Sequence, residues 1–119
     1  MVRPIVACTC DTCLTISASD SSVKAIKGEK RPLVPEVERV EVVASLEVVD
    51  FATVFVEETP VALIEELEPD VIVKGGDWDE KDVAGRESVK KWGGKVAIIP
   101  QVEGVSTTNV VEKIRKIYG

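Results

Sequence analysis

The amino-acid sequence predicts an α/β fold in which a parallel sheet carries helices on both of its faces. Short runs of β-branched or aromatic residues alternate with stretches of helical periodicity, which is typical of parallel sheets with helical crossovers. The clearest of these runs are residues 51–55, 70–73 and 95–99. A length of 119 residues fits one domain, so we expect residues 1–119 to fold as a single unit.

Each expected strand in the second half of the chain is followed by an expected helix. After residues 51–55, Thr59 is a good N-cap and Pro60 a good first helical residue, and apolar residues then recur at helical spacing to Leu67. A second unit has a helix near residues 84–92, a turn at Gly93-Gly94, a strand at 95–99 and a terminal helix from Thr107.

The first half of the chain predicts one strand and two helices. A strand at residues 14–18 precedes a short helix at Asp20–Lys27, which Gly28 closes. Residues 35–46 then form an amphipathic helix, with Val37, Val40 and Ala44 on its inward face.

Charge and hydropathy exclude several classes of protein. A net charge of −6 and a pI near 4.7 argue against general binding of DNA or RNA, which relies on clustered cations. No apolar run approaches the roughly 20 residues that span a bilayer, and no leader pattern is evident, so we expect a cytoplasmic protein without membrane contact. The basic residues of segment 24–31 suit either one small polyphosphate or a solvated helix end.

Residues 102–114 predict a helix start that suits an anion. Gly104 loosens the backbone, and Ser106, Thr107 and Thr108 then place hydroxyls and backbone N–H groups at the beginning of the terminal helix. A phosphate there would meet unsatisfied donors and the positive end of the helix dipole. An ordinary N-cap is the alternative interpretation.

Three polar clusters follow expected strands, at Ser19-Asp20, Lys74 to Asp77 and Ser106 to Thr108. Ligands of open parallel sheets bind beyond the carboxyl ends of the strands, so these clusters are expected to converge. Gly75-Gly76 would let the backbone approach a base or sugar, and Lys74 and Asp77 would supply charges of opposite sign. Trp78 would either stack on the ligand or cover the core.

Together these segments resemble one known family. The segments are Ser19-Asp-Ser-Ser-Val-Lys24, Lys27-Gly-Glu-Lys-Arg-Pro32, Pro69-Asp-Val-Ile-Val-Lys-Gly-Gly-Asp77, Gly93-Gly-Lys-Val96 and Val102-Glu-Gly-Val-Ser-Thr-Thr108. They closely resemble the sugar-phosphate adenylyltransferase domain of ADP-heptose synthases, which belongs to the cytidylyltransferase-like nucleotidyltransferase superfamily. The match runs in order from about Leu14 to Tyr118.

The resemblance implies a fold, a reaction and a set of site residues. The fold is a Rossmann-like parallel sheet with helices on both faces. In the reaction, D-glycero-D-manno-heptose 1-phosphate attacks the α-phosphorus of ATP with Mg²⁺ to give ADP-heptose, a lipopolysaccharide precursor, and pyrophosphate. Ser106 to Thr108 would contact the nucleotide phosphates, and Lys74 to Asp77 would contact the nucleotide. Lys30, Arg31 and Arg39 would contact the negative charge of phosphate groups. Glu103 and Gly104 would shape the approach to the site. The implied binding residues are Asp20, Lys30, Arg31, Lys74, Gly75, Gly76, Asp77, Glu103, Gly104, Ser106, Thr107 and Thr108.

The sequence departs from the family at its defining His-x-Gly-His motif, because it contains no histidine. That motif stabilises the transferring phosphoryl group, and loss of one such donor costs about 10²- to 10³-fold in rate. Ala18 also stands where the family has asparagine. We therefore expect impaired adenylyl transfer and assign no catalytic residue. A non-catalytic ATP- or ADP-binding module is the alternative function.

We expect the N-terminal strand-loop-helix of the family to be truncated in this sequence. Residues 3–7 could be a remnant of the family's first strand, but too few residues separate them from Leu14 for the crossover that parallel neighbours need. The segment would be a loose arm, an antiparallel hairpin or a strand paired with another subunit. Loss of a central strand would expose two apolar edges, so we expect a homo-oligomer, with strand exchange as one form.

Cys8, Cys10 and Cys13 make residues 1–13 atypical of the family. Three soft ligands in six residues suggest a Zn²⁺ site, with Asp11 or a second chain as fourth ligand. A disulfide and inert thiols are the other interpretations. A cysteine-based metal or redox module is thus a second alternative function.

Overall fold

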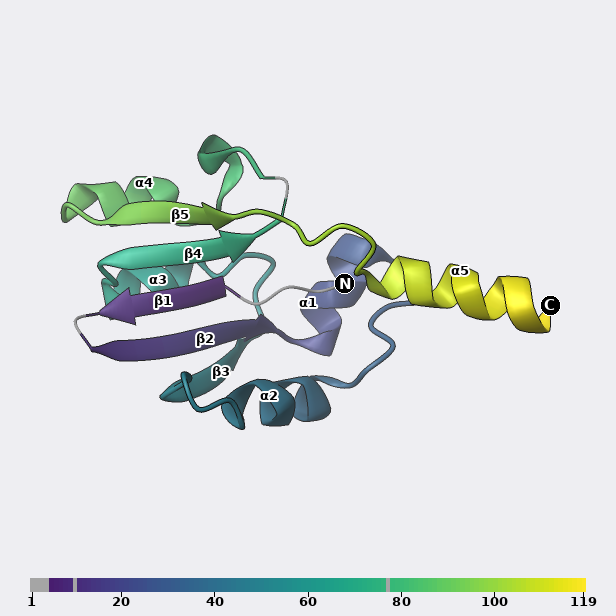
Figure 1. Cartoon of the computed structure of the whole chain (residues 1–119). Helices are drawn as coiled ribbons and strands as arrows, with labels where there is room; N and C mark the ends of the chain where they lie inside the picture. The colour runs from purple at the N-terminus through teal and green to yellow at the C-terminus, as the bar shows by residue number, and fades with distance from the viewer. Residues whose placement is uncertain (1–4, 10, 77) are drawn as a thin grey trace.

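A five-stranded mixed sheet organises the chain (Figure 1). The computed structural model describes residues 5–9, 11–76 and 78–119. In sheet order the strands are β3 (Phe51–Phe55), β2 (Thr12–Ala18), β1 (Ile5–Thr9), β4 (Val71–Gly75) and β5 (Lys95–Ile99). The pairs β2–β3 and β4–β5 are parallel, whereas β1 runs antiparallel to both of its neighbours, β2 and β4. The α/β, Rossmann-like class is confirmed, and the predicted parallel sheet is mixed because β1, for which an antiparallel hairpin was one of the predicted outcomes, runs against its neighbours.

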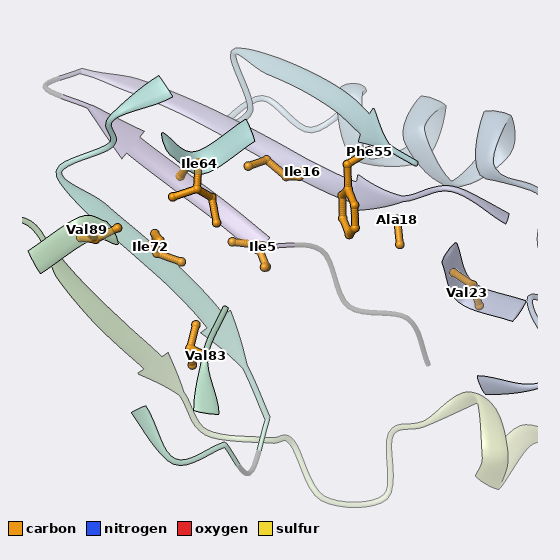
Figure 2. Close-up of a cluster of buried hydrophobic side chains, with 10 residues drawn as sticks. Ile5, Ile16, Ala18, Val23, Phe55, Ile64, Ile72, Val83 and Val89 are labelled. Atoms are coloured by element: carbon orange, nitrogen blue, oxygen red, sulfur yellow. The ribbon is translucent and has the colours of Figure 1, made fainter. Parts of the chain in front are cut away.

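Helices cover both faces of this sheet. The helical segments are α1 (Asp20–Lys27), α2 (Glu36–Ala44), α3 (Val61–Leu67), η1 (Glu80–Asp82), α4 (Arg86–Lys91) and α5 (Thr107–Tyr118). Ile64 of α3 and Val89 of α4 pack in one buried cluster with Ile16 and Ile72 of the sheet (Figure 2). The alternating residues Thr15 and Ser17 are also buried, on the opposite face, where α2 packs over β2 and β3.

Strand β1 is an antiparallel hairpin partner of β2, one of the three outcomes that the sequence allowed. Its register runs from Ile5 opposite Ile16 to Thr9 opposite Thr12, and its other edge pairs Val6 with Val73 of β4. Ile5 and Ala7 are buried, so β1 contributes apolar side chains as well as hydrogen bonds. Because β1 fills the gap between β2 and β4, the two open edges expected to drive strand exchange do not exist. Residues 3 and 4 lie outside the described part of the chain.

Two helical details differ from the sequence prediction. Helix α3 begins at Val61 with Pro60 as its N-cap and no side-chain cap, so Thr59 is not the capping residue. Helix α2 turns Val37 outward, 73% exposed, and packs instead through the half-buried Val40 and Val43. The reason is Arg39, whose guanidinium bonds the backbone of Ala18 and thereby fixes the rotation of α2 against the sheet.

Helix α5 extends away from the sheet and gives the molecule its long dimension, 52 Å against 28 and 27 Å (Figure 1). None of its residues is buried, and Val110, Ile114 and Ile117 are more than half exposed although they lie on one face of the helix. Within residues 5–9, 11–76 and 78–119, no helix has the length and apolar character needed to cross a membrane.

Candidate functional site

The four parallel strands all end at the edge of the sheet from which α1 and the connection to α5 depart (Figure 1). Two cavities open there, one beside each face, with volumes of about 490 and 600 Å³. Lys27, the last residue of α1, lines both of them. The strand ends therefore meet at one edge of the sheet, as expected from the sequence, but they border two neighbouring cavities and not one.

The first cavity, of about 490 Å³, lies beyond the ends of β2, β3 and β4. Its walls include the buried side chains of Ile5, Ile16 and Phe55, which belong to the core cluster in Figure 2. Its polar rim includes Lys74 and Ser106. An apolar cavity with a few polar groups at one side is typical of a small-molecule site.

The backbone of Gly76, directly after β4, is already engaged in the fold. Gly76 has φ of 120°, a conformation that favours glycine, and its N–H donates to the Ile99 carbonyl at 3.0 Å. That N–H therefore ties β4 to β5 and is committed before any ligand arrives. Lys74 Nζ lies 5.3 Å from the centre of the Trp78 ring, so one face of the indole already carries a cation.

The second cavity, of about 600 Å³, lies on the α2 side of the sheet and is basic. Lys27, Arg31 and Arg39 line it, and among its described lining residues no carboxylate opposes them. Thr107 and Thr108 of the first turn of α5 complete the polar part of the wall. Lys27 and Arg31 beside a helix N-terminus make this cavity suited to an anion, whereas the charge of Arg39 is already paired with Asp20.

Arg39 lines the second cavity and is held in place by hydrogen bonds to Asp20 and to backbone carbonyls. Its guanidinium donates to Asp20 Oδ1 at 2.9 Å and to the Val34 carbonyl at 2.6 Å, and its side chain is only 13% exposed. Asp20 Oδ1 also accepts the Glu36 N–H at 2.9 Å, which fixes the start of α2. The Arg39 Nε is buried and has no hydrogen-bond partner among the described residues. Asp20 thus faces Arg39 and α2, and lines neither cavity.

The start of α5 separates the two cavities. Ser106 accepts the Asn109 N–H at 3.0 Å, so it is an N-cap, and it lines the first cavity. Thr107 and Thr108 line the second. The three hydroxyls that are consecutive in the sequence therefore line two different cavities.

The structure divides the binding residues expected from the sequence into three groups. Lys74, Gly75, Gly76 and Ser106 meet at the first cavity, and Arg31, Thr107 and Thr108 at the second. Asp20, Lys30, Glu103 and Gly104 line neither, and the last three are exposed. Asp77 and Cys10 lie outside the described residues.

Several lining residues were missed at the sequence level. Glu58 and Thr59 follow β3 and line the first cavity, and Lys27 lines both. Glu58 and Thr59 could have been predicted from the sequence, because they follow the parallel strand β3. Ligands bind beyond the carboxyl ends of parallel strands, and this applies to β3 as it does to β2, β4 and β5. Lys27 belonged to the basic segment but was not singled out.

The sheet and these cavities define a Rossmann-like α/β protein with a glycine-rich strand end and a polar helix start at one edge. The family model described as cytidylyltransferase-like matches residues 9–113, and the chain belongs to this family of nucleotidyltransferases. This places the glycine-rich strand end and the α5 start within the matched region.

The chain is similar to proteins called bifunctional protein HldE. It is 50% identical over 101 residues to the one from Geobacter sulfurreducens, covering 85% of this chain and 21% of that protein. It is 52% identical over 95 residues to the one from Koribacter versatilis, covering 80% and 20%. The chain thus spans about a fifth of the length of these relatives. The resemblance to ADP-heptose synthases is confirmed.

A solved structure supports the same relationship. The lipopolysaccharide core biosynthesis protein from Thermoplasma volcanium GSS1 superposes with a TM-score of 0.54 at 28% sequence identity. The similarity covers 75% of this chain and 71% of that one.

Proposed function

We propose that the chain binds ATP in the first cavity and resembles heptose-1-phosphate adenylyltransferases in its substrates. The observation that carries this proposal is that the consecutive residues Lys74, Gly75 and Gly76 and the distant Ser106 line one cavity with an apolar wall. The base and ribose would occupy the apolar part near Phe55, and the phosphates would lie toward Lys74 and Ser106.

The sugar phosphate would bind in the second cavity. Arg31, Lys27 and the α5 start offer charge and hydroxyl groups that suit a phosphate monoester. Lys27 lines both cavities, so its ammonium group lies where charges from both substrates would meet. This arrangement favours two anionic substrates over one.

Mg²⁺ is compatible with the residues around the first cavity. Magnesium in phosphoryl-transfer sites is held mainly by substrate phosphates and water, with one or two carboxylates. Glu58 and Asp82 line the first cavity and would be those carboxylates, although no cluster of three metal-ligating groups occurs among the described residues. The ion would neutralise charge on the phosphates.

The transfer itself would depend on alignment and charge. A phosphate oxygen of the sugar phosphate would attack the α-phosphorus of ATP, and pyrophosphate would leave. Lys74, Lys27 and Arg31 would hold the two anions together. The sequence has no histidine, so turnover is expected at least about 10²-fold below that of a domain with the His-x-Gly-His motif. The proposal includes a cytoplasmic location for the chain.

The decisive experiment measures binding and turnover on the same protein. Calorimetry with ATP and Mg²⁺ is expected to give heat of binding, and pyrophosphate release with heptose 1-phosphate is expected to be slow. Release above that of a Lys74→Ala control would establish an adenylyltransferase. Binding with release equal to the control would favour the non-catalytic module, and absence of both would overturn the proposal.

Self-association is proposed to occur through α5. Val110, Ile114 and Ile117 form an exposed apolar face on a helix that has no buried residue, and a second copy would cover it. In sedimentation velocity, the wild type is expected to associate with rising concentration, and Ile114→Glu to remain monomeric. Asn109→Glu, which adds the same single negative charge at an exposed position of the same helix, should associate as the wild type does. A monomeric wild type would contradict the proposal.

A further inference from the structure

The register of the β1–β2 hairpin places two cysteines directly opposite each other. Cys8 of β1 pairs with Cys13 of β2, and their neighbours Ala7 and Leu14 form the next pair. Directly opposed residues project their side chains from the same face of a sheet. Ala7 is buried in the core cluster, so Cys8 and Cys13 project from the other face. The sequence spacing had suggested C-x-C and C-x-x-C pairs, whereas the sheet selects cysteines five positions apart.

The backbone hydrogen bonds identify the type of this pair. The Cys8 carbonyl accepts the Asp70 N–H at 2.9 Å, on the β4 side. The Cys13 carbonyl accepts the Asp50 N–H at 2.9 Å, and the Cys13 N–H donates to the Asp50 carboxylate at 2.7 Å, both on the β3 side. These backbone groups point away from the opposing cysteine, as in a non-hydrogen-bonded antiparallel pair. Cα atoms in such pairs lie about 4.5 Å apart.

That spacing permits a disulfide at the short end of its range. Disulfides join Cα atoms about 4.4–6.8 Å apart, and bonds near the limits are strained and easily reduced. Both side chains are half-buried, so a small reagent can reach them. Burial raises the pKa of the Cys13 thiol, and the charge and hydrogen bond of the adjacent Cys8 raise it further, as does the Asp50 carboxylate. These contributions agree with the register, which places the two cysteines directly opposite each other.

We propose that Cys8 and Cys13 are a reversible dithiol site that small-molecule disulfides oxidise to a cross-strand disulfide. The thiolate of one cysteine attacks a sulfur of the reagent, which forms a mixed disulfide and releases one thiol. The second cysteine then attacks the mixed disulfide and releases the second thiol. One sulfur–sulfur bond forms in the protein, one breaks in the reagent, and two electrons and two protons pass from protein to reagent.

This bond would fasten β1 to β2 at the centre of the sheet. Strand β1 also pairs with β4 and carries Ile5 into the wall of the first cavity. The oxidised chain is therefore expected to hold β1 in place more firmly than the reduced chain does. This inference does not depend on nucleotide binding, because its measurements follow the thiols themselves.

The test uses the full chain equilibrated with oxidised and reduced glutathione, then trapped with an alkylating reagent. We expect the Cys10→Ser variant to lose two hydrogen atoms and gain no alkyl group, as an internal disulfide requires. Cleavage before Asp11 should leave two peptides that separate only on reduction. Cys8→Ser and Cys13→Ser should instead accumulate mixed glutathione disulfides or disulfides with Cys10 that form more slowly.

Two results would overturn the inference. One is a Cys10→Ser chain that forms only mixed disulfides at every glutathione ratio. The other is a wild-type chain whose internal disulfide contains Cys10 in place of Cys8 or Cys13. As a second measurement, oxidised Cys10→Ser should melt several degrees above its reduced form, and amide exchange of β1 should slow.

Discussion

Replacing Gly94 with alanine is expected to lower the free energy of unfolding by about 3 kcal/mol, the upper part of the usual range for overpacking. A Cβ atom at this position would collide with Val89 Cγ1 and lie only 2.8 Å from the Asp70 carbonyl oxygen. Val89 is fully buried and cannot swing away. The Asp70 carbonyl accepts the Lys95 N–H at 2.9 Å, so moving it would disturb the pairing of β4 with β5.

The neighbouring glycine provides the matched control. Gly93 has φ of 81°, but a Cβ there would meet nothing within 4 Å. Gly93→Ala should therefore cost only the backbone strain of a left-handed residue, about 1–2 kcal/mol. Urea unfolding of both variants measures the difference. A larger loss at Gly93 than at Gly94 would show that backbone strain outweighs crowding in this turn.

Replacing Lys74 with alanine is expected to weaken ATP binding by about tenfold to a hundredfold. A hydrogen bond to a charged group contributes about 1.5–3 kcal/mol, which corresponds to that range of affinity. Lys74 is half-buried at the rim of the first cavity, where little solvent screens its charge. Titration calorimetry with ATP and Mg²⁺ gives the affinity directly.

Two variants make the Lys74 result specific. Lys81→Ala removes an exposed lysine of η1 that lines neither cavity, and it should bind ATP as the wild type does. Arg31→Ala should leave the ATP affinity nearly unchanged while weakening the sugar phosphate. If Arg31→Ala weakened ATP as much as Lys74→Ala, the assignment of two substrates to two cavities would be wrong.

The strands and helix ends with strong local signals were predicted well. Strands β3 and β5 have the predicted bounds, because β-branched and aromatic runs are flanked there by turn-forming residues. Helix α1 also has its predicted bounds, since Ser19 caps its start and Gly28, with φ of 93°, closes its end. Local chemistry decides each of these features within a few residues.

The direction of β1 and the rotation of α2 depend on distant parts of the chain. Loop length excluded a parallel pairing of β1 with β2, but the choice of a hairpin rests on burial of Ile5 and Ala7 against Ile16 and Ile72. The face that α2 presents to the sheet depends on the bonds of Arg39 to Ala18 and Asp20. Neither interaction can be inferred from periodicity alone.

The site shows the same division between local and distant information. Lys74 to Gly76 and Ser106 to Thr108 do lie at the expected edge of the sheet. Ser106 lines the first cavity, whereas Thr107 and Thr108 line the second, so the start of α5 divides these hydroxyls between the two cavities. The sequence shows which residues cluster, but the sheet decides which side each one faces.

The reversed direction of β1 determines where the polypeptide enters the fold. Ile5, the first residue of β1, lines the first cavity, at the same edge where the parallel strands finish. The start of β1 therefore lies beside that cavity, whereas the C-terminus lies at the far tip of α5 (Figure 1). An affinity tag or fluorophore should be attached after Gly119, because that residue ends α5, away from the cavity that Ile5 lines.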